Sequence, residues 1–276
     1  MCEDRLDTQS EPAHHGPVRV SLVVTRCLLR GLPRFFCVSP KTPLRVLGII
    51  ALDTLRVLRR SQPLPRKRIG ELAMVLDFLG CTNAAWDRKD LCRTEYEATR
   101  QRLERAGLGA PIGTYLRRLR DLESRRPRVG GDRRRFDEVR AYREAVARLC
   151  VRTAAAIALD VDGVGTPILA PERDTDVEAL VRILLQCQII DDVLDYTDDL
   201  SAALPSFLTA TASLSQAMEL TSAASRAYGT VRGRAIFPLR ITLALFTATA
   251  GLAVRVAGRR HRRHASLEEV CRRVGT

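Results

Sequence analysis

Five aspartates stand close together in the C-terminal half of the chain, within the segment Gln186-Cys-Gln-Ile-Ile-Asp-Asp-Val-Leu-Asp-Tyr-Thr-Asp-Asp-Leu200. They are Asp191, Asp192, Asp195, Asp198 and Asp199. On a helix, which turns by about 100° per residue, these five carboxylates fall within an arc of about 120°. No Lys or Arg occurs from residue 183 to residue 225, although the whole chain has 45 of them.

Clustered carboxylates can hold a cation. Like charges three or four positions apart each destabilise a helix by about 0.2–0.5 kcal/mol, and a bound divalent ion would offset this repulsion. Carboxylate oxygens favour Mg²⁺ over zinc. The same face continues backward through Gln188, Leu184 and Val181. The sequence therefore predicts an apolar stripe that leads into a magnesium site, and the alternative is an ordinary solvated acidic face.

The string Gln188-Ile-Ile-Asp-Asp-Val-Leu-Asp195, followed by Asp199 and Leu204-Pro205, resembles the second aspartate-rich motif of class I isoprenoid synthases. The resemblance extends loosely over residues 70–240 and is nearest to squalene/phytoene synthase-like and polyprenyl synthase-like members. It implies a helical bundle with a central apolar cavity and a prenyl diphosphate substrate of C10–C20. It also implies Mg²⁺ ligands, which are Asp191, Asp192, Asp195 and, as a possible addition, Asp199.

The family pairs this motif with a facing metal-binding helix upstream. Asn83 and Asp87 resemble a degraded form of that first motif, with Ala84 where a second carboxylate is often found. The alternative is an amphipathic helix followed by a capped turn. The degraded motif also leaves open a catalytically inactive family member that serves as a subunit or regulator.

Chain-elongating members of the family use a Gly-Lys pair, but none of the three lysines here (Lys41, Lys67, Lys89) follows a glycine. The resemblance therefore favours cyclisation or head-to-head condensation over chain elongation. The candidate diphosphate-binding residues are Arg143, Arg232 and Arg234. The candidate pocket residues are Phe78, Trp86, Val181, Leu184 and Gln188, although side chains of this kind more often belong to a plain core.

Apolar residues recur at three- and four-residue spacing from Val18 onward, which predicts an all-α fold. The predicted helices are 18–31, 43–60, 69–86, 88–106, 112–124, 134–160, 174–200, 207–228 and 236–257. We expect a disordered segment at 1–17, one all-α domain of the isoprenoid synthase type at 18–257 and a basic tail at 258–276.

The 276 residues carry a net charge of +13, and Arg accounts for nearly all of the basic residues. A rival interpretation is therefore a basic helical protein that binds partners or nucleic acid through Arg125-Arg126, Arg133–Arg135 and Arg259–Arg263. Aromatic residues are only 5% of the chain, and no helix-turn-helix or zinc motif is evident, so we expect no nucleic-acid partner. The Arg259 cluster follows an apolar segment and predicts peripheral contact with anionic lipid.

The cysteines and histidines limit the remaining possibilities. Eight Cys without a Cys-x-x-Cys pair, and an N-terminus without a secretory pattern, predict reduced thiols in a cytoplasmic protein. All four His lie near the ends of the chain, which weighs against a Ser-His-Asp triad or a His-rich zinc site. The pattern gives no indication of an oligomeric state.

Overall fold

The computed structural model describes residues 43–88, 93–160, 174–231 and 237–274. Within these ranges all regular secondary structure is helical and no strand occurs, which confirms the all-α prediction. The segment expected to be disordered, 1–17, and the predicted helix 18–31 lie outside the described residues.

Most of the predicted helices are present with ends shifted by a few residues. The observed helices are α2 (Pro43–Arg60), α3 (Arg66–Arg88), α4 (Arg93–Arg105), α5 (Gly109–Glu123), α6 (Arg133–Ala158), α7 (Thr175–Leu194), α8 (Tyr196–Ser201), α9 (Leu214–Tyr228) and α10 (Leu239–Val274). Three differences are large. The predicted helix 207–228 begins only at Leu214, as α9. The predicted helix 174–200 is divided into α7 and α8, and α10 continues well past the expected end at residue 257.

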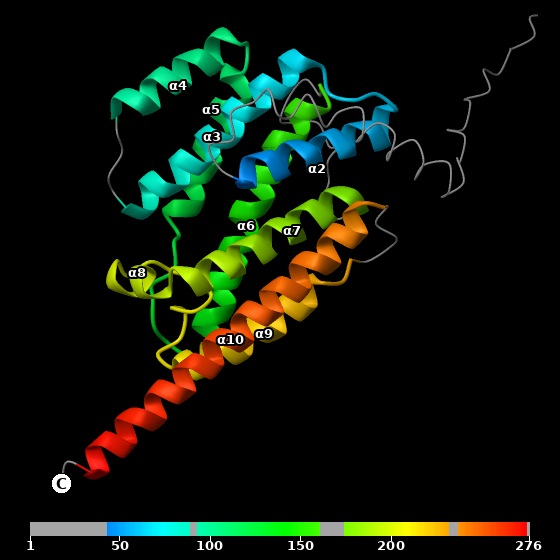
Figure 1. Cartoon of the computed structure of the whole chain (residues 1–276). Coiled ribbons are helices and arrows are strands. Elements are labelled where there is room, and N and C mark those ends of the chain that lie inside the picture. Colours follow the sequence, from blue (N-terminus) through cyan, green and yellow to red (C-terminus); the bar gives the residue numbers. More distant parts are fainter. Residues whose placement is uncertain (1–42, 89–92, 161–173, 232–236, 275–276) are drawn as a thin grey trace, which may run out of the picture.

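Helix α6 connects two hydrophobic clusters (Figure 1). The first cluster lies among α2, α3, α5 and the C-terminal half of α6, where Leu149 and Ile157 are buried. The second lies among α7, α9, α10 and the N-terminal half of α6, where Phe136 packs against Phe207 at a ring distance of 6.1 Å. Helices α6 and α7 contribute residues to both clusters and so join the two cores.

A buried amide joins the three helices of the second cluster. Gln186 on α7 is fully buried, and its Nε2 donates to the Ser225 carbonyl of α9 at 2.8 Å and to Thr247 Oγ1 of α10 at 3.0 Å. Its Oε1 accepts from Ser225 Oγ at 2.8 Å. If one of these helices moved, a buried polar group would lose its hydrogen bond, which costs free energy of folding. The network therefore fixes the relative positions of the helices.

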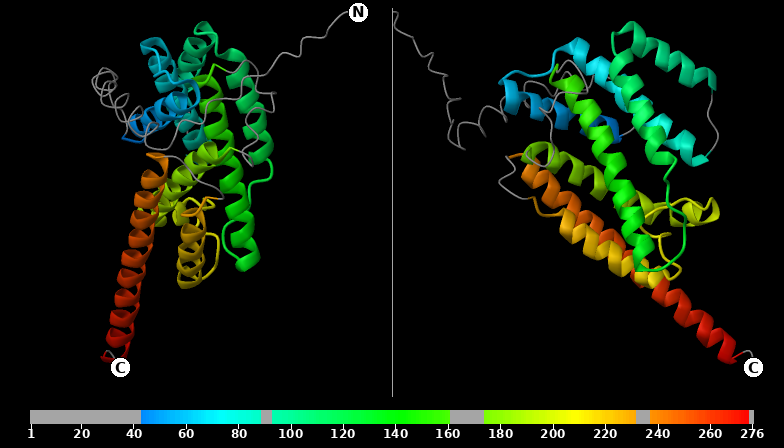
Figure 2. Two further views of the ribbon diagram at one scale, coloured as in Figure 1. Left: turned by 90° about the vertical axis from the view of Figure 1, so that its right-hand side faces the viewer. Right: turned by 180° about the vertical axis from the view of Figure 1, so that it is seen from behind.

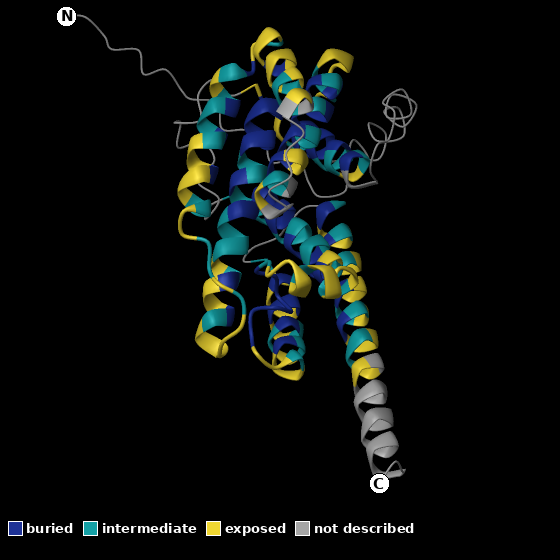
Figure 3. Ribbon diagram, turned by 90° about the vertical axis from the view of Figure 1, so that its left-hand side faces the viewer, coloured by how far each residue is buried: buried dark blue, intermediate teal, exposed yellow. Residues whose placement is uncertain are grey.

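Helix α10 packs along α7 and α9 on one side only. Figure 2 shows that its C-terminal part extends past the rest of the bundle. On the other side apolar residues are exposed to solvent (Figure 3), among them Ile241, Leu245 and Leu252. The helix thus has one face in the core and a second apolar face without a partner among the described residues.

Candidate functional site

The aspartate-rich segment is interrupted at its centre. α7 ends one residue before Asp195 and α8 begins one residue after it, with φ −100° and ψ 14° at Asp195 itself. Aspartate competes with helical hydrogen bonds, and the neighbouring negative charges repel one another, so a break at this point is physically reasonable. Asp198 and Asp199 therefore lie on a separate helix, and the prediction of five carboxylates on one helical face is wrong.

Asp192 is the buried member of the segment. Its Oδ2 accepts from the backbone N–H of Phe207 at 2.6 Å, and its Oδ1 accepts from Arg143 Nη2 at 3.1 Å. Burial raises the pKa of this carboxyl to about 6, against the opposing effects of Arg143 and the Phe207 N–H. With both oxygens engaged, Asp192 fastens α6 and the loop after α8 to the end of α7.

Asp191 and Asp195 lie on the solvent side of the same segment and are exposed. Partial burial raises the pKa of Asp191, the nearby Asp195 carboxylate raises it further, and Arg143 opposes both effects. Arg143 thus acts on Asp191 as well as on Asp192. The structure brings together four residues that the sequence selected: Asp191, Asp192, Asp195 and Arg143.

These residues can be compared with what Mg²⁺ requires. Among the described residues no group of three or more His, Cys, Asp or Glu side chains converges as a ready-made metal site. Mg²⁺ is commonly held by one or two carboxylates together with substrate phosphates and water. Asp191 and Asp195 can supply those carboxylates, and Gln188 Oε1, one turn earlier, is buried without a hydrogen-bond partner among the described residues. The donor set therefore fits Mg²⁺ bound together with a phosphorylated ligand.

In Figure 1 the C-terminal end of α3 lies on the same side of the bundle as α8. Asn83, half-buried, belongs to this part of α3, whereas the side chain of Asp87 lies outside the described residues, as do Arg232 and Arg234. Arg126, from the linker after α5, donates to the Trp86 carbonyl at 3.4 Å. This hydrogen bond ties the C-terminal end of α3 to the linker after α5.

The expected pocket residues do not share a cavity. Phe78 is buried in the first cluster and stacks on Tyr96 at a ring distance of 5.2 Å. Val181 is buried in the second cluster with Leu184 packed against it, and Trp86 is 43% exposed. The structure distributes these side chains between two cores and the surface, so a central apolar cavity lined by them is not confirmed.

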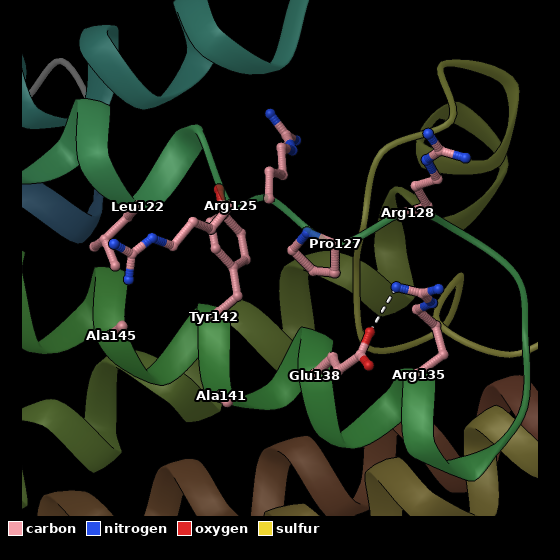
Figure 4. Close-up of a pocket in the computed structure, with 10 residues that line it drawn as sticks. Leu122, Arg125, Pro127, Arg128, Arg135, Glu138, Ala141, Tyr142 and Ala145 are labelled. Carbon is pink, nitrogen blue, oxygen red and sulfur yellow. Dashed lines mark hydrogen bonds and ion pairs between the residues drawn. The ribbon is translucent and has the colours of Figure 1, made fainter.

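A hollow in the described part of the structure lies elsewhere, between α6 and the linker 124–132 (Figure 4). It has a volume of about 610 Å³ and is lined by four arginines, Arg125, Arg126, Arg128 and Arg135. Three of these arginines belong to the basic clusters Arg125-Arg126 and Arg133–Arg135 of the sequence, and Arg128 belongs to neither. Their assembly around one cleft depends on the path of the linker, which carries no sequence motif.

Comparisons with known proteins give no further guide to this site. No protein-family model matches the chain, and neither curated proteins nor solved structures yield a match.

Proposed function

We propose that this protein is a magnesium-dependent class I isoprenoid synthase that ionises an allylic prenyl diphosphate of C10–C20. The reaction would be a cyclisation or a head-to-head condensation rather than chain elongation. One observation carries the proposal: Arg143 of α6 lies against Asp192 and acts on Asp191, beside exposed Asp195. A cation next to a pair of exposed carboxylates is the arrangement that binding a metal–diphosphate complex requires.

In this proposal Asp191 and Asp195 would hold Mg²⁺. The bound metal would neutralise the diphosphate and make it a better leaving group. Arg143 donates hydrogen bonds to the departing diphosphate oxygens. Asp192 is a positioning residue, because its hydrogen bonds with Arg143 and the Phe207 N–H hold the guanidinium next to the carboxylates.

The test is turnover of a panel of C10, C15 and C20 prenyl diphosphates with Mg²⁺, followed by detection of pyrophosphate and organic products. The double variant Asp191→Asn/Asp195→Asn should lose at least about 100-fold in rate while its helix content stays unchanged. The matched control Asp137→Asn/Glu219→Gln removes the same charge at two exposed positions on α6 and α9 and should keep full activity.

Unchanged turnover in the Asp191→Asn/Asp195→Asn variant would contradict the proposed mechanism. If neither the wild type nor the control releases pyrophosphate, the result would instead favour the alternative that this protein is a catalytically inactive family member. Salt-dependent binding of nucleic acid without any pyrophosphate release would favour the basic interaction protein.

A second proposal concerns where the protein works: α10 lies against an anionic membrane surface. In the described part of the chain one segment, Leu239–Arg259, is long and apolar enough to cross a membrane by length and composition, but it packs on α7 and α9. Its exposed residues Leu245 and Leu252 share a helical face with Arg255 and Arg259. Apolar side chains followed by arginines suit the headgroup region of anionic lipid.

Cosedimentation with vesicles tests this location. Wild type should bind vesicles that contain phosphatidylserine and leave neutral vesicles in the supernatant, and the variant Leu245→Ser/Leu252→Ser should lose most of this binding. Neutralising Arg259 to Arg263 should also release the protein. Unchanged association of both variants would overturn the proposal.

A further inference from the structure

The cleft between α6 and the linker 124–132 has more positive charge than the fold requires (Figure 4). Arg135 pairs with Glu138 at 2.5 Å, and Arg126 lies 3.5 Å from Glu123 and bonds the Trp86 carbonyl. These two arginines therefore have structural roles.

Arg125 and Arg128 differ from these two. Both line the cleft, and neither makes an ion pair or side-chain hydrogen bond with any residue that the structure describes. Glu138 is the only acidic residue among the lining residues. The positive charges of Arg125 and Arg128 are therefore not offset by a carboxylate among the described residues, and they would attract an anion in the cleft.

The linker that presents these arginines is fixed in place. The Gly130 N–H donates to the Thr209 carbonyl at 2.9 Å, and the Ala212 N–H donates to the Gly131 carbonyl at 3.0 Å. Gly131 has φ +151°, and a Cβ there would stand 2.8 Å from Cβ of Arg135, so this tight passage requires glycine. A fixed backbone lowers the entropic cost of holding the arginines around a ligand.

The lining also indicates the kind of ligand. The apolar residues Leu122, Pro127, Ala141 and Ala145 line the cleft together with the arginines. Tyr142 lines it too and donates its hydroxyl to Glu123 Oε1 at 2.7 Å. The planar guanidinium of arginine can donate two parallel hydrogen bonds to paired phosphate oxygens, whereas the side chains of the alanines and the proline suit an apolar part of the ligand. The volume of about 610 Å³ lies in the usual range for small-ligand sites.

We propose that this cleft binds a small organic diphosphate, with Arg125 and Arg128 as the principal phosphate contacts. The N-terminus of α6 is not the anion site, because the Asp132 carboxylate already caps it by accepting from the Arg135 N–H at 3.2 Å. The cleft contains no Asp and does not include Arg143, so it is separate from the Asp191 site. The inference is independent of the proposed enzymatic function.

The experiment is isothermal titration of the full chain with inorganic pyrophosphate, in EDTA and without Mg²⁺, so that carboxylate-bound metal cannot contribute. Wild type should bind one pyrophosphate saturably and more tightly than inorganic phosphate. The variant Arg125→Gln/Arg128→Gln should bind at least ten-fold more weakly. The matched control Arg117→Gln/Arg118→Gln removes two exposed arginines of α5 outside the cleft and should bind like wild type.

Other outcomes would overturn the inference. If pyrophosphate binding is not saturable, or if both double arginine variants lose the same affinity for pyrophosphate, the binding is general electrostatic attraction and not a property of the cleft. The variant Asp191→Asn/Asp195→Asn separates the two proposals: it should lose turnover and keep pyrophosphate binding in EDTA. Retained binding without turnover in wild type would support the cleft and contradict the enzyme.

Discussion

The charged groups between α2, α6 and α7 differ from those around α8 and the linker 124–132. In the first region Arg56 donates to the Ala158 carbonyl and to Asp160, each at 2.6 Å, and Arg59 pairs with Asp174 at 2.5 Å. In the second region Asp195 is exposed, and Arg128 has no ion pair among the described residues. Charges of the first kind stabilise the fold, whereas those of the second kind are available to a ligand.

This difference applies within a single motif. Asp191 and Asp192 are adjacent in sequence, yet one is exposed and the other is buried with both oxygens hydrogen-bonded. Adjacent helical positions point about 100° apart, so one turns toward α6 and its neighbour toward solvent. An aspartate-rich motif can therefore combine a structural carboxylate with ligand-binding ones.

The largest effect on stability should come from Asp192→Ala. It removes the acceptor of the Phe207 N–H and leaves the Arg143 guanidinium, whose side chain is 17% exposed, without its carboxylate. Breaking such a buried pair costs about 3–5 kcal/mol. Urea unfolding should show this loss, whereas a loss below about 1 kcal/mol would mean that Asp192 is not structural.

The pH dependence of stability should come next in size. The folded pKa of Asp192 is raised to about 6, above the usual value of about 4 for an unfolded chain. The folded state therefore holds this proton more tightly, and the contribution of Asp192 to the free energy of unfolding falls as pH rises from about 4 to about 6. The fall should reach about 2–3 kcal/mol. Urea unfolding of wild type and Asp192→Asn at several pH values measures this contribution as the difference between their free energies of unfolding. A difference that does not change with pH would contradict the raised pKa.

A smaller effect is expected from Arg56→Gln, which removes the bonds to the Ala158 carbonyl and to Asp160 at the end of α6. We expect a loss of about 1–3 kcal/mol. Arg125→Gln, at an unpaired position of the cleft, should change the free energy of unfolding by less than about 0.5 kcal/mol. Equal losses in thermal unfolding of these two variants would remove the distinction between paired and unpaired arginines.

The smallest effect should be a gain. Asp195→Asn removes a negative charge four positions after Asp191, whose pKa Asp195 raises. Relief of this repulsion should stabilise the protein by about 0.2–0.5 kcal/mol. The NMR titration of Asp191 should move to lower pH in the variant. An unchanged titration would show that the two carboxylates do not interact.

Some predictions from the sequence followed directly from local chemistry. Helical spacing of apolar residues predicted α2 and α6 closely, because an amphipathic helix needs only its own sequence to define its buried face. Local chemistry also begins α7, where the Asp174 side chain accepts from the backbone N–H groups of Asp176 and Val177. The break at Asp195 was not predicted. Apolar periodicity carries no information about the repulsion between the aspartates, or about the hydrogen bond from the Phe207 N–H to Asp192 at the end of α7.

The sequence by itself determined the helical fold and the one long window without basic residues, because spacing and composition are properties of the chain. Only the tertiary structure decided that Arg143 meets Asp192, that Phe78 and Val181 enter different cores, and that four arginines surround one cleft. Each of these depends on segments distant in sequence approaching one another. Such approaches are set by packing among helices, which no local pattern records.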